Sequence, residues 1–200
     1  MDVFGEEWHN HDQKIALNWD RVVKPEDTVL IAGDTSWAMR LPEAVPDFEW
    51  IAARPGRKIM AKGNHCYFWS TQRKMREILD PLGIEPLNAD CTMVGGTAVA
   101  ATRGWITPSD PRFDPAKDQV VYQREIQRLE RALSRVPEDA EQVIALLHFP
   151  PYANQGEETD FIKILADNAV DIVVYGHLHG RYLQNVLTGI HWNMQFYCVS

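Results

Sequence analysis

The sequence predicts an α/β fold in which two packed β-sheets are flanked by helices. Four apolar runs have the length of buried strands, and each of them ends at a polar cluster. These runs are Thr28–Ala32, Lys58–Lys62, Val143–Leu147 and Asp171–Tyr175. Helical periodicity fills most of the spacers between them, whereas two other segments have the pattern of paired short strands. Parallel strands mixed with hairpins favour two sheets.

Five helices are expected between the strands, because apolar residues recur there on one face. They lie around residues 15–22, 45–52, 75–82, 122–136 and 161–168. The segment 122–136 has the clearest pattern and carries a row of arginines on another face. That row consists of Arg124, Arg128, Arg131 and Arg135. It is a candidate surface for a phosphate-rich partner, but the interspersed Glu125 and Glu130 favour a solvated face.

Two segments interrupt the alternation of strand and helix. Residues 84–102 are expected to form several short strands, with a turn at Gly95-Gly96. Residues 182–199 are expected to form a terminal hairpin around Thr188-Gly189.

Metal-ligand residue types stand at the polar ends of the four apolar runs. They are Asp34, Asn64, His148, His177 and His179. Since ligands gather beyond the carboxyl ends of strands in an α/β sheet, we expect these side chains to converge. A carboxylate, an amide oxygen and three imidazoles suit Mn, Fe, Zn, Co or Ni. Each residue alone also has a plain structural interpretation, such as a helix cap or a core histidine. Together they predict a metal site that hydrolyses phosphoesters, because an aspartate can bridge two cations.

Four sequence blocks resemble, in order, the motifs of the calcineurin-like metallophosphoesterase superfamily. The blocks are GDTSW at 33–37, GNHCYFW at 63–69, LHFPPY at 147–152 and GHLHG at 176–180. Shorter stretches, such as WAMRL at 37–41 and ATRGW at 101–105, resemble its compact bacterial predicted phosphohydrolases. The resemblance implies a four-layer αββα sandwich. It also implies hydrolysis of a phosphate mono- or diester by a metal-bound hydroxide.

The same resemblance implies a role for each residue of the site. Asp34 would bridge two divalent metal ions, and His179 would belong to the first of them. Asn64, His148 and His177 would complete the second metal site. His65, in the second block, would act as the catalytic residue that stabilises or protonates the leaving oxygen.

Two departures from the superfamily pattern affect these expectations. The superfamily opens with an Asp-x-His block, which is absent from these 200 residues. We therefore expect a single domain over residues 1–200 that is truncated at its N-terminus. The alternative is a non-catalytic or weakly active binding protein with an incomplete dinuclear site. His9 and His11 are possible substitute ligands, although their position favours the first turn of a helix.

The second departure is Cys66, where the superfamily has an acidic residue that is expected to orient His65. Cysteine supplies no fixed charge at neutral pH unless its pKa is depressed, so His65 would be a weaker acid. Cys66 is equally well interpreted as a small buried side chain without a chemical role.

Other side chains near the blocks are candidates for substrate contacts. Arg103 is proposed as a phosphate clamp, since a guanidinium matches phosphate oxygens; a rim ion pair is its structural alternative. Trp37, Trp69 and Trp105 are placed to wall the pocket, and packing is an equally good interpretation.

Composition limits the class of partner. The formal net charge of -8 disfavours long nucleic acid, so we expect a phosphorylated small-molecule or nucleotide-like substrate. No apolar stretch approaches the ~20 residues of a membrane span, and the three cysteines form no disulfide framework. These features favour the cytoplasm. Substrate identity, native metal and oligomeric state do not follow from the sequence.

Overall fold

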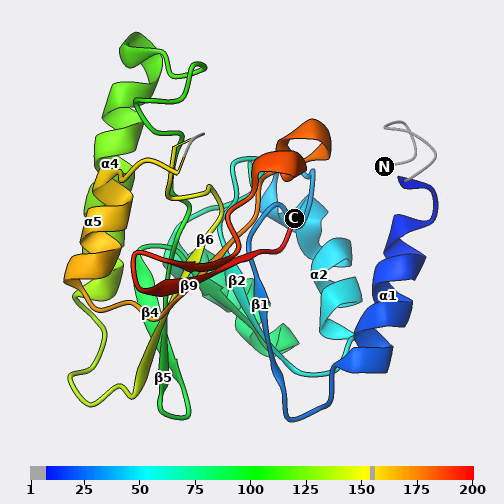
Figure 1. Cartoon of the computed structure of the whole chain (residues 1–200). Helices are drawn as coiled ribbons and strands as arrows, with labels where there is room; N and C mark the ends of the chain where they lie inside the picture. Colours follow the sequence, from blue (N-terminus) through cyan, green and yellow to red (C-terminus); the bar gives the residue numbers. More distant parts are fainter. Residues whose placement is uncertain (1–7, 154–155) are drawn as a thin grey trace.

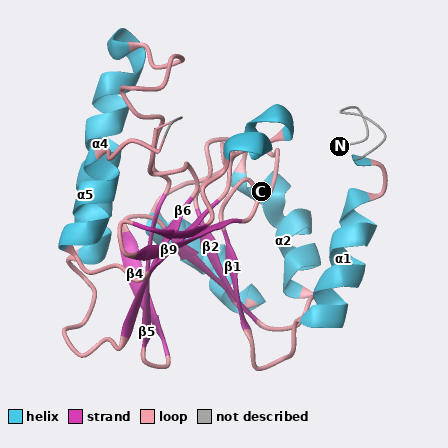
Figure 2. Cartoon of the chain, viewed as in Figure 1, coloured by secondary structure: helices cyan, strands magenta, loops and turns pink. Residues whose placement is uncertain are grey.

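The computed structural model describes residues 8–153 and 156–200, which form an αββα sandwich (Figure 1). The outer layers are α2 (Val45–Ala52) with α3 (Gln72–Leu79), and α4 (Pro115–Leu133) with α5 (Asp160–Asp167). Two β-sheets lie between them (Figure 2). The predicted fold class is therefore confirmed. An additional helix, α1 (His11–Val22), lies beside α2.

The smaller sheet is parallel and has the order β1-β2-β3 within the described residues. Its strands are β1 (Thr28–Ile31), β2 (Arg57–Ala61) and β3 (Ile84–Leu87). A 3-10 turn, η3 (Leu41–Ala44), precedes α2, and another, η4 (Asp80–Leu82), extends α3. The carboxyl ends of β1 and β2 lead directly into the Asp34 and Asn64 loops.

The larger sheet has the order β4-β5-β6-β7-β9-β8 in the described part of the chain. Its strands are β4 (Asp90–Val94), β5 (Thr97–Thr102), β6 (Gln142–Leu147), β7 (Ile172–Tyr175), β8 (Gly189–His191) and β9 (Met194–Cys198). The four central strands are parallel, and the edge strands β4 and β8 are antiparallel to their neighbours. The carboxyl ends of β6 and β7 carry His148 and His177, and η5 (Gly180–Asn185) follows.

Alternation along the strands assigns side chains to three hydrophobic cores. In β2, Ile59 and Ala61 face the larger sheet, whereas Met60 packs with α2 and α3. Across the seam between the sheets lie Val99, Ala101, Leu146 and Val174. The opposite face of the larger sheet packs against α4 and α5. Both faces of both sheets are thus covered, as expected for parallel strands with apolar sequences.

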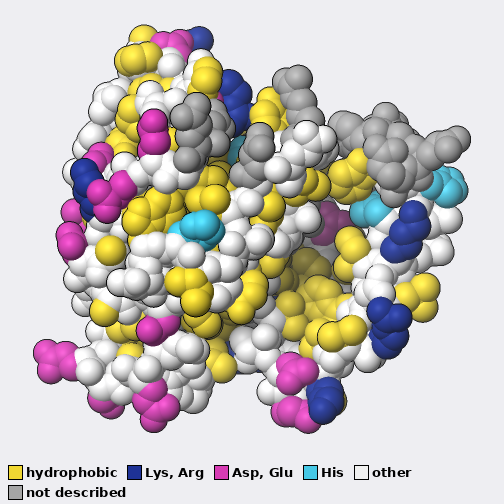
Figure 3. Space-filling model, viewed as in Figure 1, with side chains coloured by type: hydrophobic (Ala, Val, Ile, Leu, Met, Phe, Trp, Pro, Cys, Tyr) yellow, Lys and Arg dark blue, Asp and Glu magenta, His cyan; other side chains and the backbone are white. Residues whose placement is uncertain are grey.

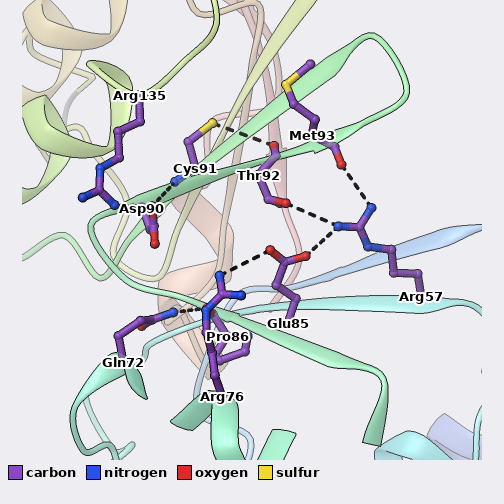
Figure 4. Close-up of polar contacts among 10 residues, drawn as sticks. All are labelled: Arg57, Gln72, Arg76, Glu85, Pro86, Asp90, Cys91, Thr92, Met93 and Arg135. Atoms are coloured by element: carbon purple, nitrogen blue, oxygen red, sulfur yellow. Dashed lines mark hydrogen bonds and ion pairs between the residues drawn. The ribbon is translucent and has the colours of Figure 1, made fainter. Parts of the chain in front are cut away.

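A polar network joins the two sheets at the end opposite to the carboxyl ends of the parallel strands (Figure 4). Arg57 of β2 donates hydrogen bonds to Glu85 of β3 at 2.6 Å and, across the seam, to the Met93 carbonyl oxygen at 3.1 Å. It also reaches Thr92 Oγ1 at 3.3 Å. One guanidinium therefore cross-links strands β2, β3 and β4.

Helix α1 is held to the body mainly by polar contacts. Its residues are all at least partly exposed, although Trp19 packs against the α2/α3 core and donates a hydrogen bond to the Pro55 carbonyl oxygen at 3.0 Å. An ion pair joins Asp20 to Arg54. Hydrophobic side chains line a hollow beside α1 in the space-filling view (Figure 3). No described helix has the length and apolar character needed to cross a membrane.

Two sequence predictions are wrong in detail. The terminal hairpin turns at Trp192-Asn193, both with positive φ, rather than at Thr188-Gly189. Such a two-residue turn requires left-handed backbone, which asparagine adopts readily. The second error concerns Glu125, which does not lie on a solvated face: it is 0% exposed. Its carboxylate accepts hydrogen bonds from Thr102 and Arg103 and forms an ion pair with Arg128.

Candidate functional site

Four of the five predicted metal ligands meet where β1, β2, β6 and β7 end. Asn64 Oδ1 lies 2.6 Å from His148 Nε2 and 3.0 Å from His177 Nδ1. The two imidazole nitrogens are 3.2 Å apart. Asp34 Oδ2 lies 3.3 Å from the same nitrogen of His148. The convergence expected from the strand ends is therefore present for Asp34, Asn64, His148 and His177.

Close packing of two glycine-containing loops brings Asp34 to this position. A Cβ atom built on Gly63 would lie 2.0 Å from Asp34 Oδ1, and one built on Gly33 would lie 2.6 Å from the Gly63 nitrogen. Only glycine fits at these contacts. Asp34 Oδ1 accepts the backbone N–H of His65 at 2.8 Å, which fixes the carboxylate between the loops.

Two of the convergent residues have strained backbone. Asp34 has φ 53 and His177 has φ 72, in the left-handed region that non-glycine residues seldom occupy. Such strain persists only where the surrounding structure enforces it, and it concentrates at functional sites. At both positions the strain aims a polar side chain at the same point.

Burial keeps both histidine rings neutral. It lowers the pKa of His148, against the opposing effect of the Asp34 charge. Burial, followed by the charge of His148, lowers the pKa of His177 to about 3. At neutral pH each ring therefore has one nitrogen with a free lone pair, which is the form that binds metal ions.

The hydrogen-bond pattern around His148 suits a bound cation. Its Nδ1 faces the Ala32 carbonyl oxygen at 2.8 Å, while its Nε2 faces Asn64 Oδ1 at 2.6 Å. A neutral imidazole has a single N–H, so one of these contacts joins two acceptors. With the proton of His148 on Nδ1 and that of His177 on Nε2, the lone pairs of His148, His177 and Asn64 point at one another. A cation satisfies all three in this state; without one, either an N–H on His177 Nδ1 or a turned Asn64 amide would supply a donor.

The ionisable side chains alone do not form a metal-binding group in the described residues. In the part of the chain that the structure describes, no group of three or more His, Cys, Asp or Glu side chains is arranged to hold a metal ion. The convergent set includes Asp34, His148 and His177, but the contacts among these three run through His148 Nε2, and Asn64 Oδ1 joins the two histidines. Asn64 thus adds an amide oxygen to the ionisable side chains, and an amide oxygen is itself a ligand for hard cations.

His179 lies apart from the convergent set. Its side chain is exposed, and its ring packs edge-on against Trp8 with the centroids 6.4 Å apart. No contact within residues 8–153 and 156–200 joins it to Asp34. His11 begins α1, as predicted, and its Nδ1 lies 3.1 Å from the Trp8 carbonyl oxygen. His9 lies in the turn that precedes the helix.

His65 is held by two aromatic neighbours. Its ring stacks on Trp37, with centroids 4.8 Å apart, and its Nδ1 lies 3.1 Å from the Tyr67 hydroxyl. Cys66 has a different position from the one expected for a partner of His65. Its Sγ accepts the Gly63 N–H at 3.3 Å in the buried floor of the loop. Burial raises the pKa of the Cys66 thiol, so this side chain is neutral at physiological pH.

Arg103 forms a largely buried ion pair. Its Nη2 donates to Glu125 Oε1 at 2.8 Å, and its guanidinium lies 4.4 Å from the centroid of the Trp105 ring. The Arg103 carbonyl oxygen accepts the backbone N–H groups of His148 and Phe149. Its backbone therefore supports the loop that carries His148. The Arg103 side chain was interpreted as a phosphate clamp or as part of an ion pair at the rim. The ion pair is present, but it is buried rather than at a rim. Binding of phosphate by Arg103 stays a prediction.

The other two tryptophans pack against the body of the protein. Trp105 lies 5.1 Å from Phe149, whose ring is 4.0 Å from that of His177, centroid to centroid. Trp69 packs against the core between the smaller sheet and α2 and α3. Trp105 therefore supports a wall of the site through Phe149.

The pocket next to His177 was not predicted from the sequence. Asp110 and Arg112, from the segment between β5 and α4, line it together with Tyr182. That segment has no hydrophobic period, so nothing in it marked these residues as neighbours of a histidine in the loop after β7. Tyr67 was not predicted as a site residue, because only other positions of the block GNHCYFW at 63–69 were assigned a function.

Comparison with known proteins agrees with this geometry. Residues 7–181 match the family model of the calcineurin-like phosphoesterases. Over 55 residues the chain is 44% identical to the Gene 66 protein of Mycobacterium phage L5. That stretch covers 28% of this chain and 26% of the phage protein, so the similarity spans about a quarter of that relative's length. Because the family match includes all the strand-end clusters that meet at the site, the chain belongs to the calcineurin-like phosphoesterase family.

Proposed function

We propose that this protein hydrolyses a phosphate mono- or diester with a divalent metal ion held by Asp34, Asn64, His148 and His177. The meeting of Asn64 Oδ1, His148 Nε2 and His177 Nδ1 within 2.6–3.2 Å of one another carries the proposal. Membership of the phosphoesterase family supports the reaction type. The substrate class we favour is a phosphorylated small molecule, including nucleotide-like compounds, because the net charge of -8 opposes longer polyanions.

The donor set fits Mn, Fe, Zn, Co or Ni, since it combines imidazole nitrogen with carboxylate and amide oxygen. When bound, such an ion supplies activation of water and neutralisation of phosphoryl oxygens. The protein's part is to hold the ligands. Gly33 and Gly63 allow the Asp34 loop to approach, and the Ala32 carbonyl oxygen fixes the His148 ring.

His65 is proposed to act on the leaving oxygen. Trp37 covers one face of its ring, and Tyr67 contacts Nδ1, which leaves Nε2 as the nitrogen available to a substrate. A histidine held in this way can donate a proton or a hydrogen bond to the departing alkoxide. Aryl phosphates need this assistance less, because an aryl oxide is a better leaving group.

Metal analysis of the purified chain tests the proposal. After exhaustive dialysis we expect about one tightly bound divalent ion per chain, because His179 stands apart from the four convergent ligands. Mn²⁺-supplemented protein should hydrolyse p-nitrophenyl phosphate or its bis ester, and His148→Ala should lose both the ion and the activity. Two tightly held ions would show that the ligand assignment is incomplete.

The alternative function is metal-dependent binding without hydrolysis. The separation of His179 from the other candidate ligands is the observation that favours it. A chain that retains one ion per molecule but turns over neither aryl ester would support this alternative and contradict the proposed phosphoesterase activity.

A pair of neighbouring substitutions tests how His65 is positioned. We expect Tyr67→Phe to lower kcat for an alkyl phosphate by about tenfold and to have a smaller effect on an aryl phosphate, because it removes the hydroxyl next to His65 Nδ1. Cys66→Ala is the comparison at the neighbouring position: its Sγ faces the Gly63 N–H and Asp34 Oδ1 rather than the His65 ring, so any loss of kcat should be the same for both substrates. Kinetics with ethyl phosphate and p-nitrophenyl phosphate measure both effects. A larger and substrate-dependent loss in Cys66→Ala would return the positioning role to residue 66.

A further inference from the structure

A cavity of about 50 Å³ opens next to His177, on the side away from the Asp34 loop. The loops after β5, β6 and β7 form its walls, which combine apolar and polar surface. Phe149 and Tyr182 supply aromatic surface, while Asp110 and Arg112 supply charge. At ~10–15 Å³ for each water position, the space suits a compact group rather than a nucleobase.

Asp110 fixes the Arg112 side chain on the wall of this cavity. Asp110 Oδ1 accepts the backbone N–H of Arg112 at 2.8 Å and its Nε at 3.0 Å, and Oδ2 accepts Nη2 at 2.7 Å. Both carboxylate oxygens are thus occupied by one partner. Two further backbone hydrogen bonds, from Asp110 to Thr107 and from Phe113 to Asp110, stiffen the loop. The guanidinium is consequently held in place before any ligand arrives.

The other edge of the guanidinium is available to a ligand. Arginine has five N–H donors; the Asp110 carboxylate uses two of them and a side-chain hydrogen bond to Tyr182 engages a third, which leaves two for a ligand. The Arg112 side chain is 47% exposed, whereas that of Asp110 is 9% exposed. The guanidinium also lies 5.0 Å from the centroid of the Tyr182 ring, which supports its plane. A fixed planar cation with free donors binds carboxylate or phosphate oxygens well.

The position of the Arg112 guanidinium relates it to the proposed reaction. His177 belongs both to the convergent ligand set and to the cavity wall, so the cavity that Arg112 lines adjoins the proposed metal site. The cavity is therefore placed to receive a substrate group that lies near the scissile bond.

We propose that Arg112 binds a second compact oxyanion on the leaving side of the substrate. Preferred substrates are phosphate esters whose alcohol carries a carboxylate or another phosphate a few atoms from the scissile oxygen. This inference rests on the proposed function for the reaction, but binding of an anion at Arg112 can be measured without hydrolysis.

Matched substrates provide the test. Phosphoglycolate has a carboxylate where ethyl phosphate has a methyl group, and ethylene glycol bisphosphate carries a second phosphate, whose phosphorus lies two bonds farther from the scissile oxygen than the carboxylate carbon. For the unmodified chain we expect kcat/KM to be at least about tenfold higher for one or both of the compounds with a second anionic group than for ethyl phosphate. The better of the two identifies the oxyanion. Equal values for all three compounds would overturn the proposal.

Substitution of Arg112 separates binding from support of the fold. Arg112→Gln should reduce the substrate ratio to about one, and Arg112→Lys should give an intermediate ratio because it keeps the charge without the fork. If Arg112 only supports the fold, Arg112→Gln would lower kcat/KM for all three esters in parallel and leave their ratios unchanged. That result would overturn the proposal. Arg73→Gln, on an exposed face of α3, is the charge-matched control and should keep the ratio of the unmodified chain.

Calorimetric binding of the same compounds distinguishes failure of this inference from failure of the proposed function. If no ester is hydrolysed, the phosphoesterase proposal fails. Tighter binding of phosphoglycolate or the bisphosphate than of ethyl phosphate, lost in Arg112→Gln, would still support the subsite. Equal affinities would contradict it whether or not the esters are hydrolysed.

Discussion

Replacing Asp34 with asparagine is expected to abolish hydrolysis and metal binding together. The Asp34 carboxylate is the anionic member of the convergent set, 3.3 Å from His148 Nε2. An amide in its place removes the negative charge that balances the cation. We expect kcat/KM for an aryl phosphate to fall by at least about a thousandfold, with a parallel fall in bound metal.

The variant is well suited to separate chemistry from folding. Asparagine adopts left-handed backbone readily, as φ 53 at this position requires, and its Oδ1 can still accept the His65 N–H. The melting temperature of the metal-free protein should therefore change little. Asp167→Asn, at the exposed end of α5, removes the same charge elsewhere and should retain activity. Full activity in Asp34→Asn would mean that the site has been assigned to the wrong residues.

The second large effect is expected from Gly63→Ala. The added methyl group would lie 2.0 Å from Asp34 Oδ1 and 2.5 Å from the Asp34 nitrogen, distances that no real Cβ atom maintains. Two loops would have to separate, and the Asp34 carboxylate would move with them. We expect a loss of about 2–4 kcal/mol in unfolding free energy, together with loss of the bound metal.

Gly95→Ala is the matched control for this substitution. Gly95 has φ 58 in the turn between β4 and β5, and nothing lies within 4 Å of a Cβ atom built there. The control therefore measures backbone strain without a clash, and it should cost about 1 kcal/mol and leave activity intact. At this chain length each kcal/mol corresponds to about 2–4 °C in Tm. Equal Tm values and equal activities for the two variants would contradict the steric argument.

The site was predictable where chemistry coincided with strand ends. Asp34, Asn64, His148 and His177 follow apolar runs, and a parallel sheet places such residues at one edge. The alternation expected for His177 and His179 on an extended segment does not hold, because His177 adopts φ 72. The metal role of His179 stays a prediction.

The positions of residues at strand ends did not predict the contacts within loops or the burial of charged side chains. Glu125 has the sequence setting of a solvated helix face, and its burial follows only from its contacts with Thr102 at the end of β5 and with Arg103 directly after it. The pairing of Asp110 with Arg112 depends on consecutive turns in a segment without periodicity. The hairpin was predicted, but its turn was assigned to the glycine rather than to Trp192-Asn193. Tertiary context outweighed local preference in each case.

The Arg57 cross-link has a consequence for how stability and function are divided. It joins the sheets at one end of the seam, and the candidate ligands occupy the loops at the other end. The hydrophobic layers between these ends contain none of the candidate ligands. The contacts that hold the two sheets together are thus made by other residues than the candidate metal ligands, unlike in small domains that fold only around their metal. Apart from Gly33 and Gly63, which let the two loops approach, loop residues at the end that holds the candidate ligands can consequently vary in sequence without dismantling the architecture.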